Sequence, residues 1–446
     1  MARFALKSNR VFVDGVLRPA QVVVDGELIE AVLDADAAFD GDCVDVGHKV
    51  VMPGLVDTHV HINEPGRTDW EGFKTATRAA IAGGVTTVVD MPLNCIPVTT
   101  TQEALQVKLA ACRPSLYADT GFWGGVVPGN ASEIEKLADD GILGAKAFMI
   151  DSGIPEFEWS DNDALRAGML ALKKKGCVLL AHCEVDLGAE IGNVNPQAYE
   201  SFLESRPQSW EVEAISRLIG LCRETRCPIH IVHLSAAAAL PLIRAAKREG
   251  LPLTVETCPH YLTIASEEIP DGATQYKCCP PIREASNRAL LWQALEDGTI
   301  DMVTTDHSPC TPNLKLQERG DFHEAWGGIS SLQLGLPLIW STASDRGIAL
   351  ETVLGWMSAT PAKIAGLDDR KGSIAPGKHA DLVVFDPTAR ATVDAAQLQM
   401  KNKLTPYDGR IVTGVVEHTY LRGKRVFSEG EFAPPSGQPL LGRKTP

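Results

Sequence analysis

Two histidines stand one residue apart at the end of the apolar run MPGLVDTHVH, which spans residues 52–61. If this run is a β-strand, side chains at positions i and i+2 point to the same face, so His59 and His61 project together with Asp57 one step before them. One buried histidine is most often a satisfied core residue, whereas two on one strand face are more typical of a metal site. We therefore predict a metal site at this strand end, with Asp57 either orienting the histidines or capping the strand.

Four other short apolar runs carry side chains that can bind a metal or bear charge. These side chains are Lys146, His182, His233 and Asp306. His230 and His233 lie three residues apart on one run, so only one of them can point inward. We assign the inward position to His233, which is nearer the end of the run, and a structural role to His230.

Lys146 is the unusual member of this set, because an ammonium group repels a divalent cation. It is either a buried ion-pair partner or a lysine whose deprotonated amine is carbamylated by CO₂. The carbamate is an anion with two oxygens and can bridge two metals, which would lie ~3.5–4 Å apart and generate a hydroxide at neutral pH. The residue types alone leave both possibilities open.

The elements that would position these side chains alternate between short β-rich runs and longer, more polar stretches. Eight runs qualify as strands: 54–61, 85–92, 117–126, 144–150, 177–184, 228–235, 253–262 and 302–309. The stretches between them often end in glycine, as helices do. The pattern predicts an α/β fold with a closed (β/α)₈ barrel of the TIM type, whose active site lies at the carboxyl ends of the strands. An open doubly wound sheet is the alternative, but no GxGxxG motif follows the first strand.

The two ends of the chain differ from the middle, because both read as short strands separated by turns. Neither end alone has enough strands for a stable sheet, so we expect the two to form a small β-sandwich beside the barrel. The predicted boundaries are 1–53 for the N-terminal part of the sandwich, 54–371 for the barrel, and 372–446 for the C-terminal part and tail. The tail from about residue 433 is rich in proline and glycine, and we expect it to be loose.

Composition excludes several function classes. A net charge of −15 argues against nucleic-acid binding and against attraction to anionic membranes. No apolar run is long enough for a membrane helix, and the opening MARFALKSNR lacks the apolar core of a secretory signal. The eleven scattered cysteines contain no CxxC pair, which indicates reduced thiols in a cytoplasmic protein.

The motifs, taken in order, resemble those of the cyclic amidohydrolases, which include dihydroorotases, hydantoinases, dihydropyrimidinases and allantoinases. The resemblance rests on DTHVH, Lys146, AHCE, IVHLS, ETCPHYL, TTDHSPC and KGSIAPGKHADLVVFD, and it covers nearly the whole chain. Within this group, HINEPGRTDWEGF, MPLN, KCCPPIRE and AWGGISSLQ are most similar to allantoinases. The resemblance therefore implies metal-dependent hydrolysis of the cyclic amide of allantoin to allantoate, a step of purine catabolism, by a cytoplasmic homotetramer.

The resemblance also implies a role for each matching residue. One metal would be held by His59, His61 and Asp306, the other by His182 and His233, and both by carbamylated Lys146 (N6-carboxylysine). The two divalent ions would be zinc, or cobalt, manganese or iron, since the mixed nitrogen and oxygen ligands suit each of them. Asp306 would take the proton of a metal-bridging hydroxide and deliver it to the leaving nitrogen, as general base and then general acid.

Three further residues are expected at the substrate. Dihydroorotases carry an arginine for the substrate carboxylate two residues after the second histidine, where this chain has Asn63; an amide suits a neutral ring such as allantoin. Asn94, in MPLN, is either a substrate-contacting amide or a turn residue. Cys279 replaces an expected hydroxyl residue, in a loop that can hold the ring through its backbone.

Three alternatives stay open at this point. A hydantoinase or dihydropyrimidinase would share the metal site but differ in the pocket, and a dihydroorotase would need the missing arginine. A non-enzymatic scaffold would be expected to have lost ligands, whereas this chain keeps all six. A panel of allantoin, dihydroorotate, hydantoin and dihydrouracil would separate these possibilities.

Overall fold

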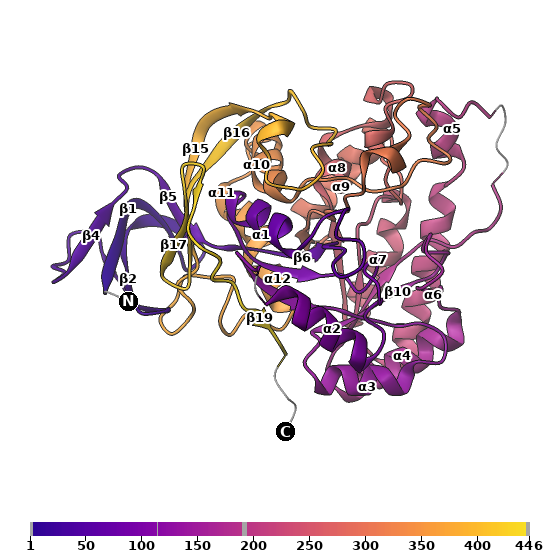
Figure 1. Cartoon of the computed structure of the whole chain (residues 1–446), viewed down its shortest axis with the longest axis horizontal. Helices are drawn as coiled ribbons and strands as arrows, with labels where there is room; N and C mark the ends of the chain where they lie inside the picture. The colour runs from indigo at the N-terminus through magenta and orange to yellow at the C-terminus, as the bar shows by residue number, and fades with distance from the viewer. Residues whose placement is uncertain (1–2, 114, 190–193, 443–446) are drawn as a thin grey trace.

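Strands from both ends of the chain join in one sheet, seen at the left of Figure 1. The computed structural model describes residues 3–113, 115–189 and 194–442. Within them, nine strands form a mainly antiparallel sheet in the order β18-β17-β16-β15-β5-β1-β2-β3, with β4 beside β1. Their bounds are β1 Phe4–Val13, β2 Val16–Asp25, β3 Leu28–Asp34, β4 Asp42–Asp45, β5 Val50–Pro53, β15 Leu382–Thr392, β16 Ile411–Leu421, β17 Lys424–Ser428 and β18 Glu431–Phe432. The expected union of the two chain ends is thus present as hydrogen-bonded strand pairs.

The middle of the chain supplies parallel strands in chain order. They are β6 Leu55–Val60, β7 Val85–Asp90, β8 Asp119–Phe122, β9 Gly124–Gly125, β10 Gly144–Phe148, β11 Val178–His182, β12 Ile229–Ile231, β13 Leu253–Thr257 and β14 Met302–Val303. One sheet holds β6, β7 and β8, and a second holds β9 to β14, each strand pairing with the next along the chain. Only Trp123 separates β8 from β9, and a parallel bridge between Val60 and His307 places the segment after β14 beside β6. Each of the eight predicted runs contains parallel strand, so this part of the prediction is confirmed.

Helices alternate with these parallel strands and lie around them in Figure 1. Their bounds are α1 Phe73–Ala82, α2 Gln102–Cys112, α3 Ala131–Asp139, α4 Asn162–Lys174, α5 Tyr199–Glu204, α6 Gln208–Thr225, α7 Leu240–Arg248, α8 Pro259–Thr263, α9 Ala285–Glu296, α10 Gly335–Asp345, α11 Leu350–Leu354 and α12 Thr360–Ile364. Side-chain caps fix the starts of two of them: Thr101 accepts from the Ala104 amide at α2, and Asp161 accepts from the Ala164 amide at α4.

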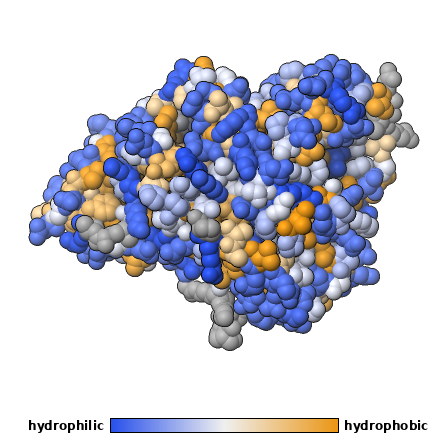
Figure 2. All heavy atoms as spheres, in the orientation of Figure 1, coloured by the Kyte–Doolittle hydropathy of each residue, from blue (hydrophilic) through white to orange (hydrophobic). Residues whose placement is uncertain are grey.

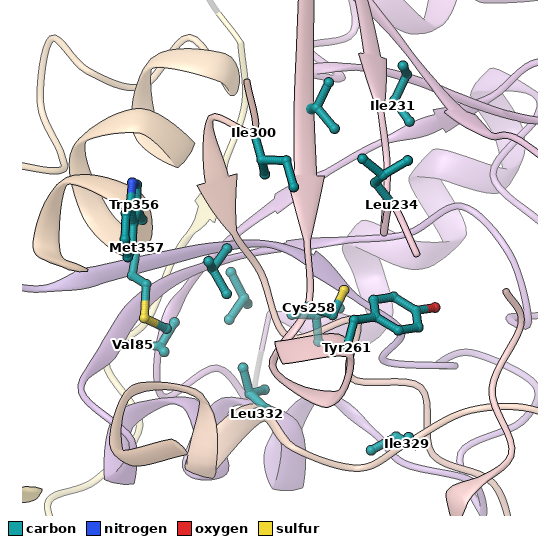
Figure 3. Close-up of a cluster of buried hydrophobic side chains, with 14 of the residues drawn as sticks. Val85, Ile231, Leu234, Cys258, Tyr261, Ile300, Ile329, Leu332, Trp356 and Met357 are labelled. Carbon is teal, nitrogen blue, oxygen red and sulfur yellow. The ribbon is translucent and has the colours of Figure 1, made fainter. Parts of the chain in front are cut away.

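Apolar side chains of these strands and helices form a large core cluster, part of which is drawn in Figure 3. There, Met357, between α11 and α12, points towards Val85 at the start of β7. A smaller cluster packs within the terminal sheet, with Leu6, Val22 and Leu382 among its fully buried members. The face shown in Figure 2 is mainly hydrophilic with scattered apolar residues. No helix within the described ranges has the length and apolar character needed to cross a bilayer.

The C-terminal tail is more ordered than its composition predicts. Strand β19, Pro439–Leu440, pairs in parallel with β8, and the Thr120 amide donates to the Gln438 carbonyl at 2.9 Å. The expectation of a loose tail is wrong for residues 433–442, because their backbone groups find partners on β8 and at Val426, Leu116 and Gly141. Residues 443–446 of the predicted C-terminal part, and residues 1 and 2 of the N-terminal part, lie outside the described residues.

Candidate metal centre and active site

A cavity of about 240 Å³ opens beyond the carboxyl ends of the parallel strands. Five of the six side chains predicted as metal ligands line it: His61, Lys146, His182, His233 and Asp306. The sixth, His59, is fully buried and contacts Asp306. Strand ends are a consistent source of such side chains, because parallel neighbours all end at the same edge.

The first group joins β6 to the segment after β14. His59 Nε2 lies 3.2 Å from Asp306 Oδ1, and His61 Nε2 lies 3.6 Å from the same oxygen. Asp306 has a left-handed backbone conformation, with φ 43°. Burial raises the pKa of Asp306 well above its ordinary value, although the nearby Lys146 charge opposes this shift.

The second group joins β11 to the segment after β12. His182 Nδ1 lies 3.0 Å from His233 Nε2, so two ring nitrogens meet at the cavity wall. The His182 ring stacks on Phe148 with 4.5 Å between ring centroids, and its Nε2 lies 2.8 Å from Glu184 Oε2. His233 has φ 38°, again a left-handed conformation at a strand end. The ring of His182 is therefore fixed from both sides.

Lys146, on β10, is fully buried, and its Nζ has no hydrogen-bond partner within the described part of the chain. A buried ammonium without an acceptor is costly, so such groups tend to lose their charge. Burial lowers the pKa of Lys146 to about 8, against the opposing effects of Asp306 and Glu256. The ion-pair alternative therefore finds no direct partner among the described residues, and the amine loses its proton more readily than an exposed lysine does.

Comparisons with known proteins agree with this geometry. The sequence model of the Amidohydrolase family matches residues 50–426. This chain belongs to the amidohydrolase family. It is 49% identical to a protein named Allantoinase from Streptomyces avermitilis and 44% identical to one from Saccharomyces cerevisiae, each over 98% of both chains. Among solved structures it is similar to "L-Hydantoinase (Dihydropyrimidinase) from Arthrobacter aurescens", with a TM-score of 0.92, 30% identity, and 99% and 100% of the two chains covered.

Amidohydrolases generally bind divalent metal, and the donor set of this amidohydrolase fits one. Ligand atoms of His59, His233 and Asp306 lie within 4.8 Å of one another. His61 Nδ1 and His233 Nδ1 are buried without hydrogen-bond partners among the described residues. Burial lowers the pKa of His59 to about 4 and those of His61 and His233 well below the ordinary value. The histidines are therefore neutral, which is the state in which imidazole binds metal.

Several supporting residues of this amidohydrolase escaped the sequence analysis. Glu256 on β13 contacts His59 and His230, and Glu184 contacts His182 and Arg206. Each carboxylate is fully buried. Burial alone would raise the pKa of Glu184, but Arg206 and His182 lower it to about 2. A charged residue inside an apolar strand, as in LTVETCPHYL, was the available signal for Glu256.

Asp57 and His230 were predicted to have supporting or structural roles. Asp57 accepts from the backbone amides of His59 and Thr305, at 3.1 and 3.2 Å, so it fixes the strand end and contacts no histidine ring. His230 lies outside the cavity lining, with its Nε2 3.0 Å from Glu256 Oε2, and its structural role stays a prediction.

The three residues expected at the substrate divide into two kinds. Asn94 and Cys279 line the cavity. Asn63 does not, and its side-chain amide donates to the Pro309 carbonyl at 3.3 Å. The cavity also has lining residues that the sequence analysis did not single out, including Arg206, Lys277 and Trp326.

Proposed function

We propose that this amidohydrolase opens the hydantoin ring of allantoin by hydrolysis to give allantoate. The observation that supports the proposal is similarity over 98% of both chains to proteins named Allantoinase, in a chain that retains the complete donor set around one cavity. The solved structure named for hydantoinase activity is similar at a lower identity, 30%, so hydantoin hydrolysis is the second candidate. Dihydroorotase activity is not favoured, because the sequence has Asn63 at the position where dihydroorotases carry an arginine for the substrate carboxylate.

In the proposed site, His59, His61 and Asp306 would hold one divalent metal, His182 and His233 would hold the other, and Lys146 would serve both as a carbamate. Carbamylation joins the Lys146 nitrogen to the carbon of CO₂ and releases one proton. Bound metal supplies Lewis-acid polarisation of the ring carbonyl and acidifies water. We expect zinc, with cobalt, manganese or iron as alternatives, because the donors are nitrogen and oxygen.

The side chains of this chain then move the proton. Water adds its oxygen to the ring carbonyl carbon, and Asp306 accepts the proton that this oxygen loses. The carbon–nitrogen bond of the ring breaks, and Asp306 returns the proton to the departing nitrogen, so one water is consumed and no other reactant is needed. Asn94 and Cys279 contact the substrate in this proposal because they line the cavity, whereas Asn63 acts through the Pro309 loop.

The proposal extends to the fold that carries the site. The chain-order pairing of β6 to β14, with the bridge from Val60 to His307, supports a closed (β/α)₈ barrel over residues 54–371. The separate apolar cluster of the terminal sheet supports a β-sandwich built from residues 1–53 and 372–446. We further propose that the protein is cytoplasmic, because all eleven cysteines are free thiols. We also propose a homotetramer, and light scattering in solution measures the mass that tests it.

A hydrolysis panel tests the function. Metal-loaded protein is given allantoin, hydantoin, dihydrouracil and dihydroorotate, and ring opening is followed for each. We expect allantoin to have the highest kcat/KM and dihydroorotate to show no measurable turnover. Preference for dihydrouracil or simple hydantoins would contradict the proposal and favour the second candidate.

A further inference from the structure

One carboxylate, that of Glu256, contacts three groups around the proposed metal centre. Its side chain is fully buried on β13. Oε1 contacts His59 Nδ1 and accepts from the His233 backbone amide at 3.2 Å, while Oε2 lies 3.0 Å from His230 Nε2. These contacts join β6, β12 and β13 through a single side chain.

The contact with His59 decides which ring nitrogen is available to a metal. A carboxylate only accepts hydrogen bonds, so His59 carries its proton on Nδ1 and keeps the lone pair on Nε2. His59 Nε2 is the atom that lies 3.2 Å from Asp306 Oδ1. Glu256 therefore orients the ring of His59 and selects the tautomer in which it can bind metal.

The contact with His233 acts on the backbone. His233 has φ 38°, a conformation that residues other than glycine rarely adopt, and its amide is held by Glu256 Oε1. From this turn the His233 ring reaches within 3.0 Å of His182 Nδ1. Glu256 thus stabilises the turn that presents a second proposed ligand.

Neighbouring groups hold Glu256 itself in place. His230 contacts Oε2 and has its other ring nitrogen 2.8 Å from Thr254 Oγ1. The second buried carboxylate of the site, Glu184, makes narrower contacts, with the ring of His182 and with Arg206. Within the described residues, Glu256 is the carboxylate that contacts both proposed ligand sets from behind.

We propose that Glu256 is the positioning residue of the metal centre, holding His59 of one ligand set and His233 of the other so that both metals bind. This inference rests on the proposed function for the assignment of the two ligand sets. Glu256 does not line the cavity and acts through the two histidines. Carboxylates that hold metal-binding histidines typically change metal affinity about 10- to 100-fold when they are removed.

Glu256→Gln is the principal test. The amide keeps the size of the side chain, but its nitrogen donates a hydrogen bond and cannot accept one. At one of the two histidine rings the amide must therefore donate where the carboxylate accepted. We expect zinc affinity, measured by chelator competition, to fall about 10- to 100-fold at both sites. Parental affinity, or a loss confined to one site, would overturn the proposal.

A second set of variants separates positioning from folding. Asp119→Asn removes another fully buried carboxylate, one that pairs with Lys371 and Arg422 away from the cavity. We expect Asp119→Asn to lower the Tm of the metal-free protein with unchanged zinc affinity, and Glu256→Gln to lower zinc affinity with the smaller change in Tm. If Glu256→Gln does not fold, Glu256→Asp, which keeps the charge but withdraws it by one methylene, is measured in its place and should lose affinity at both sites.

Failure of the inference and failure of the proposed function give different results. Zinc loss in Glu256→Gln from a parent that does not open allantoin would leave the positioning role in place and overturn the proposed function. Allantoin hydrolysis by the parent, with parental zinc affinity in Glu256→Gln, would overturn the positioning role alone. A parent that binds none of zinc, cobalt, manganese and iron would overturn both.

Discussion

At the scale of single residues, the site combines buried neutral donors with one buried amine. The histidine pKa values are lowered by burial, and Lys146 has no acceptor among the described residues. Buried polar atoms without hydrogen-bond partners cost about 1–3 kcal/mol each. Metal and a carbamate would satisfy these atoms together.

Lys146→Ala tests the carbamate directly. Without the bridging anion the metals would bind weakly and acidify water poorly, so we expect a large loss of allantoin hydrolysis. The vacated space admits a short carboxylate such as acetate or propionate, whose two oxygens can replace those of the carbamate. Activity should rise with carboxylate and divalent metal added together, and much less with either alone, because an untethered ligand must be ordered.

Lys146→Arg is the matched control for this rescue. Its stem fills the space and its guanidinium stays cationic, so added carboxylate should give no recovery. The intact mass of the parent protein should show one added CO₂. Full activity of Lys146→Ala without additives would show that Lys146 is only a packing residue.

Asp306→Asn separates metal binding from proton transfer. The amide cannot take the proton of the attacking water, so we expect kcat to fall by at least ~10²-fold. Zinc content should be partly retained, because four histidines and Lys146 remain. Measurements of kcat and of zinc per chain on the same sample check this; an active variant would remove Asp306 from the mechanism.

At the scale of elements, β10 must lie close to its neighbours for Lys146 to reach the cavity. A Cβ added at Gly144, where β10 begins, would lie 2.6 Å from the Val178 carbonyl oxygen and 2.9 Å from the Trp123 ring. Backbone atoms of β11 can move away only at an energetic cost, so we expect Gly144→Ala to lower the free energy of unfolding by about 1–3 kcal/mol. Urea unfolding measures the change.

Gly220→Ala provides the comparison for this substitution. Gly220 lies within α6, and an added Cβ there meets no atom within 4 Å. Alanine favours the helix, so this variant should be more stable by roughly 0.5–1 kcal/mol. Equal effects at the two glycines would show that close packing at β10 is not the cause.

Sequence patterns predicted the strands and the placement of several polar side chains at their ends, because both depend on local order. Apolar runs bounded by turns marked the strands, and a strand end marks the cavity edge, so position alone placed His59, His182 and His233 near this edge. The contact between Glu256 and His59 could not be predicted in this way, because it joins residues 197 positions apart. Period-two alternation gives the face of a strand but not its partner across the interior. The prediction of a loose tail was wrong for a related reason, because composition does not show that the edge of another strand is available to β19.

At the scale of the whole molecule, a buried ionic network joins the terminal sheet to the parallel strands. Lys371 lies 2.7 Å from Asp119, at the start of β8, and 2.5 Å from Asp381, and Arg422, which follows β16, also pairs with Asp119. The Gln438 amide donates to Asp119 Oδ1 at 2.9 Å, which ties the C-terminal tail to the same carboxylate. Asp119 is therefore a shared anchor for three parts of the chain that are distant in sequence.

This anchor should make stability depend on pH in one direction. Burial alone would raise the pKa of Asp119, but the charges of Lys371 and Arg422 outweigh it, and the folded-state pKa lies below the ordinary 3.8. A lowered pKa means stabilisation that is fully present above pH 3.8 and is lost as the pH falls through the folded-state value.

At pH 7, Asp119→Asn leaves two buried cations with less compensation, so we expect it to lower the free energy of unfolding by about 3–5 kcal/mol. The difference in free energy of unfolding between parent and variant should narrow as the pH falls below 3.8, because the unfolded parent then gains a proton at Asp119 that the variant cannot gain. Urea unfolding of both proteins across this range measures the difference, and one that is independent of pH would show that the network acts through packing and not through the charge of Asp119.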